Sequence, residues 1–132
     1  MTPLHVVQLF YETMGQGDAA AALRLLDASI QWREAEMFPY YSGTWIGPEE
    51  VKNNLLVHFA HDWEFFNVTA ESFVAEDAVV VAFGTYTGIF KATGKHLAAP
   101  FAHRWEVSKG KAIAFRQYTD TALVLAALTN ER

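Results

Sequence analysis

The sequence predicts a single α+β domain, spanning residues 1–132, in which helices pack on one face of an antiparallel sheet. Apolar residues recur at helical spacing before Trp63, and four segments rich in β-branched and aromatic residues follow it, separated by turn signals. Because 52% of the 132 residues are apolar and 19% are charged, the chain has enough apolar surface for one full core. The alternative is an ordinary two-layer sandwich without a cavity.

Three helices are expected in the first half of the chain. The first begins at Thr2 and Pro3, a capping hydroxyl followed by a residue preset for the first turn, and ends at Gly15. Asp18 caps a second, alanine-rich helix. The third helix starts at Gly47-Pro48 and has acidic residues in its first turn, where the helix dipole favours them. The apolar positions of the first and third helices are Val6, Val7, Phe10, Met14, Val51, Leu55 and Phe59.

Four strands are expected in the second half. Their sequences are "FFNVTAESFVA", "AVVVAFGTYTGIF", "KHLAAPFAHRWEV" and "KAIAFRQYT". Turn residues separate them at Glu76-Asp77, at Ala92-Thr93-Gly94 and at Ser108-Lys109-Gly110. This pattern predicts an antiparallel meander. The apolar tail from Thr121 to Leu128 is predicted to be a last short helix or strand.

Composition excludes several classes of function. The net charge is −5 and the ten basic residues are scattered, so no nucleic-acid partner is expected. The absence of cysteine excludes disulfides and thiolate metal sites. The N-terminal "MTPLHVVQLFYETM" is too polar and too short to span a membrane, and it lacks a basic region and a cleavage site. We therefore expect a cytoplasmic protein without a membrane partner.

The segment "IQWREAEMFPYYSGTW" combines acids with aromatic residues. If Ile30 to Glu36 is extended, Trp32, Glu34 and Glu36 share one face and Arg33 lies on the other. Either that face is solvated, which would make Glu34 a strand-edge charge, or it lines a cavity with an acid in an aromatic wall. Glu36 is interpreted as a surface charge.

The register of the last hairpin decides which side chains share its functional face. A two-residue turn at Lys109-Gly110 places His103 opposite Arg116 and gathers ionisable groups among aromatic ones. A three-residue turn instead places Ile113 and Phe115 beside His103. The sequence leaves both registers open. In the first, the shared face carries Phe101, His103, Trp105, Arg116, Tyr118 and Asp120.

Each of these residues also has an ordinary structural interpretation. His103 is equally a core histidine held by one hydrogen bond, and Asp120 precedes an apolar run and so fits a helix cap. Tryptophans are more often core than ligand platform, and Arg116 can pair with a neighbouring carboxylate. His58, His61 and the adjacent Asp62 lack a further convergent ligand, so no metal site and no organic cofactor are expected.

The order and spacing of three segments resemble the nuclear-transport-factor-2-like superfamily, in its SnoaL-like, ketosteroid-isomerase-related branch. The segments are "LFYETMGQGDAAAALRLLDASIQWRE", "YSGTWIGPEEV" and "FAHRWEVSKGKAIAFRQYTDTA". The resemblance implies a cone: a curved antiparallel sheet wrapped around long helices, with a deep pocket at its open end. It also implies a homodimer, for which Ile113 and Phe115 are candidate outer-face residues.

The resemblance assigns roles residue by residue. Glu34 is similar in position to the carboxylate base of the isomerases. His103 and Asp120 occupy places similar to the substrate-facing histidine and aspartate of SnoaL-like cyclases, which makes them the other candidate catalytic residues. Other side chains of the two shared faces, and Tyr41 in the expected pocket rim, are candidates for contacts with a small apolar ligand. They are Trp32, Tyr41, Phe101, Trp105, Arg116 and Tyr118.

Two departures from the isomerase pattern restrict the expected reaction. The position at which the isomerases carry a tyrosine that donates to the developing oxyanion falls on Phe10 here. The neighbouring Tyr11 is expected to point elsewhere on the helix. The position of the aspartic acid donor falls near Ala102 or His103. Steroid isomerisation is therefore not expected. The resemblance leaves two function classes: a cofactor-independent acid–base enzyme of isomerase or cyclase type acting on a carbonyl- or hydroxyl-bearing molecule, or a non-catalytic binding protein.

Overall fold

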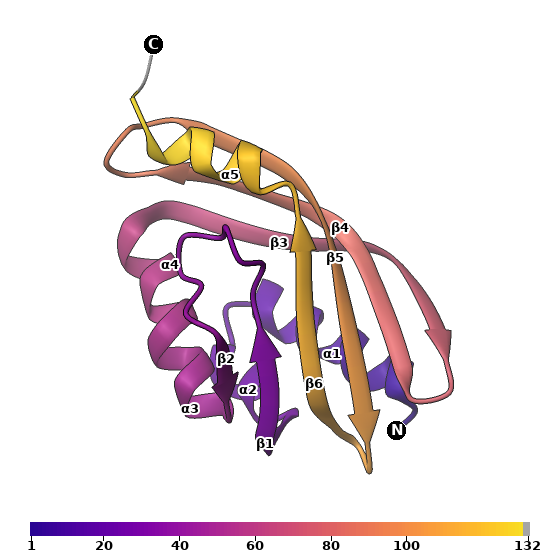
Figure 1. The fold of residues 1–132 in the computed structure, drawn as a ribbon. Coiled ribbons are helices and arrows are strands. Elements are labelled where there is room, and N and C mark those ends of the chain that lie inside the picture. Colours follow the sequence, from indigo (N-terminus) through magenta and orange to yellow (C-terminus); the bar gives the residue numbers. More distant parts are fainter. Residues whose placement is uncertain (131–132) are drawn as a thin grey trace.

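A computed structural model describes residues 1–130 as helices packed inside a curved six-stranded sheet (Figure 1). The predicted α+β fold is confirmed. The helical elements are α1 (Pro3–Gly15), α2 (Ala19–Leu23), α3 (Pro48–Val51), the π-helical turn η1 (Lys52–Leu56), α4 (Val57–Asp62) and α5 (Thr121–Leu128). The strands are β1 (Leu26–Arg33), β2 (Thr44–Ile46), β3 (Trp63–Glu76), β4 (Val79–Phe90), β5 (His96–Ser108) and β6 (Lys111–Thr119).

The sheet has the strand order β2-β1-β6-β5-β4-β3. The strands β3 to β6 form the predicted antiparallel meander, and the short β2 pairs antiparallel with β1. The pair β1–β6 is parallel, which makes the sheet mixed rather than wholly antiparallel. This pairing is what brings the acid-bearing end of β1 beside β6.

Helix α1 supplies the inner layer. Its N-cap is the predicted one, since Thr2 Oγ1 accepts a hydrogen bond from the His5 backbone N–H over 3.1 Å. The helix contacts β3, β4, β5 and β6, and it buries Val6, Val7, Phe10 and Tyr11. Burial of both Phe10 and Tyr11 means that two adjacent positions of α1 face the concave side of the sheet.

The remaining helices close the two ends of the layer. Residues Pro48 to Asp62 form one helical stretch interrupted by η1, and they pack against β1, β2 and β3. The tail forms a helix, α5, which packs against β4 and β5 (Figure 1). Asp120 caps α5, because its side chain accepts a hydrogen bond from the Leu123 backbone N–H over 3.2 Å. Of the two predicted states of the tail, the helix is therefore the one observed.

A β-bulge sets the register of the β5–β6 hairpin. The turn is the two-residue one at Lys109-Gly110, since Ser108 pairs with Lys111 and Val107 with Ala112. Glu106 then pairs with Ala114, so Ile113 is an extra residue on β6. Beyond the bulge His103 lies opposite Gln117 rather than Arg116. The register that placed Arg116, Tyr118 and Asp120 with His103 is therefore wrong.

Candidate functional site

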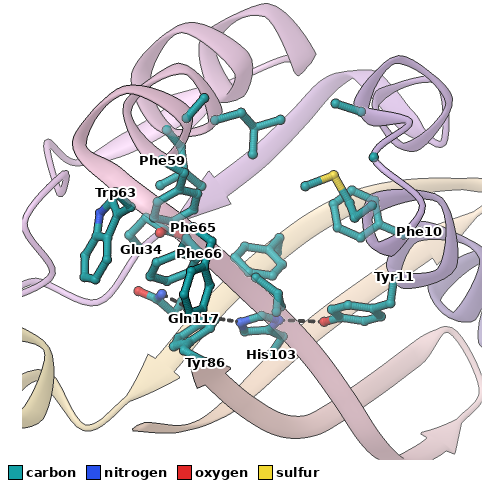
Figure 2. A pocket seen from close by; sticks show the side chains of 18 of the residues that line it. Phe10, Tyr11, Glu34, Phe59, Trp63, Phe65, Phe66, Tyr86, His103 and Gln117 are labelled. Carbon is teal, nitrogen blue, oxygen red and sulfur yellow. Dashed lines mark hydrogen bonds between the residues drawn. The ribbon is translucent and has the colours of Figure 1, made fainter. Parts of the chain in front are cut away.

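A cavity of about 310 Å³ lies on the concave side of the sheet, between α1, the η1–α4 stretch and strands β1, β3, β4, β5 and β6. Its wall is mainly apolar and aromatic (Figure 2). The polar side chains that line it are Tyr11, Glu34, Glu64, Tyr86, His103 and Gln117, and no Lys or Arg is among the lining residues that the structure describes. A cavity of this composition and size is typical of a small-molecule site.

Glu34 follows the last residue of β1 and is the buried acid of the cavity. The side chain of Glu34 is only 3% exposed. The Trp32 indole Nε1 donates a hydrogen bond to Glu34 Oε2 over 2.9 Å, as expected when residues two apart in an extended segment share a face. Burial raises the pKa of Glu34 to about 8, against a smaller lowering effect of the Trp32 hydrogen bond. At neutral pH this carboxyl is therefore mostly protonated.

His103 lies between two tyrosines (Figure 2). Its Nδ1 is 2.6 Å from the hydroxyl oxygen of Tyr11 on α1, and its Nε2 is 2.5 Å from the hydroxyl oxygen of Tyr86 on β4. Burial lowers the pKa of His103 to about 3, and neither ring nitrogen bonds a carboxylate of the described chain. The imidazole is therefore neutral at physiological pH.

Each tyrosine oxygen receives one further hydrogen bond from a fixed donor. Trp105 Nε1 donates to Tyr11 over 2.9 Å, and Gln117 Nε2 donates to Tyr86 over 2.8 Å. The orientation of the Gln117 amide is settled by its other end, because its Oε1 accepts from the Ala35 backbone N–H over 2.9 Å. Burial raises the pKa of both Tyr11 and Tyr86, so both phenols remain protonated.

Aromatic stacking holds these polar groups in place. Phe101 stacks on the His103 ring with centroids 4.0 Å apart, and Trp32 stacks on Phe115 at 3.7 Å. Closely packed rings leave a side chain few alternative rotamers. The stacking therefore fixes His103 and the indole that bonds Glu34.

The structure brings together part of the predicted site. Glu34, Trp32 and His103 line the cavity, as the sequence predicted. Phe101 and Trp105 are buried around His103 and Tyr11 rather than exposed to the cavity space. Their positions agree with the interpretation of Trp105 as a core residue that also supports the site.

The other predicted site residues lie outside the cavity. Asp120 caps α5 and is exposed, so the expected approach of its carboxylate to His103 is wrong; the two tyrosines take both ring nitrogens instead. Because of the bulge, Arg116 and Tyr118 point outward, where the guanidinium lies 5.4 Å from the tyrosine ring. Tyr41 lies beside Arg33, its hydroxyl oxygen 3.5 Å from the guanidinium, and also lies outside the cavity lining.

Sequence reasoning missed four polar residues that line the cavity: Tyr11, Glu64, Tyr86 and Gln117. Tyr11 was expected to point away from the pocket, but two neighbouring positions of α1 are buried under the curved sheet. Gln117 enters the cavity only because of the bulge. The signal that was available for Tyr86 is the alternation along β4, which buries Val80, Ala82 and Tyr86 on one face.

Among residues 1–130 no group of three or more His, Asp or Glu side chains could hold a metal ion; His61 bonds Asp62 at 2.8 Å and His58 lies 3.9 Å from the same carboxylate. No helix of the described chain is long and apolar enough to cross a membrane.

Comparison with known proteins gives the family. Residues 7–115 match the SnoaL-like domain, and the chain belongs to this family. No curated protein is significantly similar in sequence. An NTF2-like protein from Burkholderia thailandensis E264 is similar in structure, with a TM-score of 0.94 and 29% identity over 98% of each chain. The NTF2-like fold is thereby confirmed.

Two more distant structures share the fold. TerC, co-crystallised with polyporic acid, has a TM-score of 0.84 and 20% identity, covering 96% of this chain and 97% of TerC. A candidate SnoaL-like polyketide cyclase from Jannaschia sp. CCS1 has a TM-score of 0.80 and 18% identity, covering 98% of this chain and 93% of the other.

Proposed function

We propose that this protein is a cofactor-independent acid–base enzyme of isomerase or cyclase type, acting on a small apolar molecule that bears a carbonyl or hydroxyl group. The observation that carries the proposal is Glu34, a buried carboxyl in an aromatic cavity whose pKa is raised to about 8. A carboxyl with a pKa near the working pH can both release and take up a proton. Such a group contributes about 10²–10⁴-fold to a proton-transfer reaction.

Glu34 is the proton carrier in this proposal. Its Oε2 accepts the Trp32 hydrogen bond, which leaves Oε1 as the oxygen without a partner among the described residues. Near pH 8 the ionised form removes a proton from carbon next to a carbonyl, and the protonated form returns it at another atom of the ligand. A phenol O–H of Tyr11 or Tyr86, both of which line the cavity, would donate to the oxygen where negative charge develops.

The cavity supports a neutral ligand of one or two rings. Its volume of about 310 Å³ is roughly twice that of an apolar protein cavity that binds benzene, about 150 Å³. A ligand carrying a permanent negative charge would lack a cationic partner, since no Lys or Arg lines the cavity in the described residues. The similarity to TerC, which was co-crystallised with polyporic acid, supports a small organic ligand.

The test uses 2-tetralone as a defined ring ketone with acidic C–H groups. Proton NMR in D2O at pD 8 follows exchange of those hydrogens for deuterium. The parent protein should accelerate the exchange, and Glu34→Gln should abolish the acceleration because the amide cannot carry the proton. Glu36→Gln, whose side chain is 70% exposed, is the matched control and should exchange like the parent. Equal exchange by parent and Glu34→Gln would remove Glu34 from the mechanism.

The second candidate function is non-catalytic binding in the same cavity. The observation that favours it is His103, whose two nitrogens are both bonded to tyrosines and whose low pKa keeps it neutral, so it is not a ready acid or base by itself. The exchange experiment separates the two functions. A binder would show saturable changes in tryptophan fluorescence with 2-tetralone but no exchange above the solvent rate.

We also propose that the protein is a cytoplasmic homodimer. Apolar side chains exposed on the sheet, among them Val74, Phe83 and Ile113, support a partner surface. Phe115, the other residue assigned to the outer face from sequence, is buried inside beside Trp32 and is not part of that surface. Sedimentation equilibrium at micromolar concentration should give twice the chain mass of 14.8 kDa, whereas a value of 14.8 kDa would contradict a dimer.

A further inference from the structure

The three side chains Tyr11, His103 and Tyr86 carry more polar hydrogens, O–H and N–H, than the hydrogen bonds between them can use. Each phenol carries one O–H, and a neutral imidazole carries one N–H and one acceptor nitrogen. Together the three side chains have three polar hydrogens but form only two hydrogen bonds with one another, Tyr11–His103 and His103–Tyr86. One hydrogen must therefore point elsewhere.

The surplus hydrogen belongs to a phenol. The imidazole N–H faces one of the two phenol oxygens whichever nitrogen carries it. Trp105 and the Gln117 amide nitrogen can only donate, so neither can accept a phenol hydrogen. Among residues 1–130 neither phenol has an acceptor other than His103. One buried O–H is therefore left for an acceptor that residues 1–130 do not provide.

We propose that His103 is a tautomeric switch that decides whether Tyr11 or Tyr86 presents its O–H to a ligand. With the hydrogen on Nε2, His103 donates to Tyr86, Tyr11 donates to Nδ1, and the Tyr86 O–H is free. With the hydrogen on Nδ1, His103 donates to Tyr11, Tyr86 donates to Nε2, and the Tyr11 O–H is free. Both phenols line the cavity, so either tautomer serves a ligand that accepts a hydrogen bond through a carbonyl or ether oxygen.

The same unit can also pass a proton to a ligand oxygen on which negative charge has developed. When Tyr86 gives its hydrogen to a ligand oxygen, the Nε2 hydrogen moves to the Tyr86 oxygen and the Tyr11 hydrogen moves to Nδ1. Tyr11 then regains its proton from a water molecule, which leaves as a hydroxide ion; Tyr11 also lines a groove with Gln8, Glu12 and Thr69. All three rings end neutral, and one proton has passed from that water molecule to the ligand oxygen.

This inference deepens the proposed function, and it rests on that function only for the use of the donated proton. The neutral state of His103, on which the hydrogen count depends, agrees with its burial and its low pKa. The titratable groups around it are Tyr11 from α1, Tyr86 from β4, and Glu34 and Glu64, which line the same cavity. None of them is a cation that would replace a phenol as donor.

Long-range ¹H–¹⁵N NMR of the imidazole tests the switch in the ligand-free protein at pH 7. The spectrum distinguishes the two neutral tautomers from each other and from the cation, and His103→Gln identifies the signal. In Tyr11→Phe the hydrogen should lie on Nε2, because a buried N–H is left without a partner less readily than a lone pair. In Tyr86→Phe it should lie on Nδ1 for the same reason.

The two variants control for each other, since each removes one tyrosine hydroxyl and the two hydroxyls lie on opposite sides of the imidazole. Finding the same tautomer in both variants would overturn the switch, and so would a cationic imidazole in the parent. Gln117→Leu removes the donor to Tyr86 together with the acceptor of the Ala35 N–H, and in this variant the imidazole hydrogen should lie on Nε2 at least as much as in the parent. A shift toward Nδ1 would equally overturn the inference. If the tautomers shift as expected but the parent does not accelerate the deuterium exchange of 2-tetralone, the proposed function is contradicted and the switch is not.

Discussion

The indole Nε1 of Trp32 donates a hydrogen bond to Oε2 of Glu34, two residues later in the chain and 2.9 Å away. The bond joins an aromatic wall to the buried acid of the cavity, and it holds one of the two carboxyl oxygens in place. Because burial outweighs this bond, the carboxyl keeps its proton to a much higher pH than an exposed glutamate does.

Stability on the alkaline side should depend on Glu34. Its pKa is about 8 in the folded protein against 4.5 for the free group, so between these values the folded state holds a proton that the unfolded state has lost. Stability should therefore fall as pH rises from 4.5 to 8, by of the order of 1 kcal/mol per pH unit. Urea unfolding at pH 6, 7 and 8 measures this, with Glu34→Gln as reference. A difference in the free energy of unfolding between parent and Glu34→Gln that stays constant from pH 6 to pH 8 would contradict the raised pKa.

His103 should have the opposite effect on the acid side. Its pKa is about 3 when folded against 6.5 when free, so between these values the unfolded state takes up a proton that the folded state refuses. Stability should therefore rise with pH from 3 to 6.5, again by of the order of 1 kcal/mol per unit. The free energy of unfolding of the parent relative to His103→Gln, measured at pH 4, 5 and 6, tests this. The two effects oppose each other between 4.5 and 6.5, so the parent alone should show a plateau there.

The sequence predicted the acid face but not the partners of the histidine. Alternation from Trp32 to Glu34 follows from extended geometry, whereas Glu36 turns outward because β1 ends at Arg33. The extra residue Ile113 is a bulge that no local signal marks, and it reverses the facing of every later residue of β6. Periodicity located the strands; it could not supply their register.

The neighbours of Tyr11 show a second limit of the same kind. Helical spacing predicted that Phe10 takes the inward position and that Tyr11 points elsewhere, because adjacent residues point about 100° apart. A sheet that curves around α1 contacts a wider arc of the helix than a flat one would, and both residues are buried. Curvature of the sheet depends on contacts distant in sequence, which the local pattern does not contain.

Gly84 is predicted to be required for the packing behind His103. A Cβ at this position of β4 would lie 2.0 Å from the Thr69 carbonyl oxygen and 2.6 Å from the Phe101 ring, which stacks on His103. Gly84→Ala should therefore destabilise the protein by about 3 kcal/mol in urea unfolding. Gly15→Ala is the matched control, since its Cβ would meet nothing within 4 Å, and it should be neutral or slightly stabilising. Equal stability of the two variants would show that β4 can move away from Thr69.

Asp120 should matter for α5 and not for the cavity. Asp120→Ala removes the carboxylate that accepts from the Leu123 N–H, so unfolding should become easier by about 1 kcal/mol. Asp120→Asn keeps a capping oxygen and should retain most of that stability. Both variants should bind 2-tetralone and exchange its hydrogens as the parent does. A tenfold loss of exchange in Asp120→Asn would restore this residue to the site.

The protonation state of Glu34 is the central claim, and infrared difference spectroscopy measures it directly. Subtracting the spectrum of Glu34→Gln from that of the parent isolates the carboxyl of this one residue. The account predicts a protonated carboxyl band at pH 6 that is lost with a midpoint near pH 8, in accord with the pKa of about 8 that burial gives this group. A spectrum that shows only ionised carboxylate at pH 6 would contradict it.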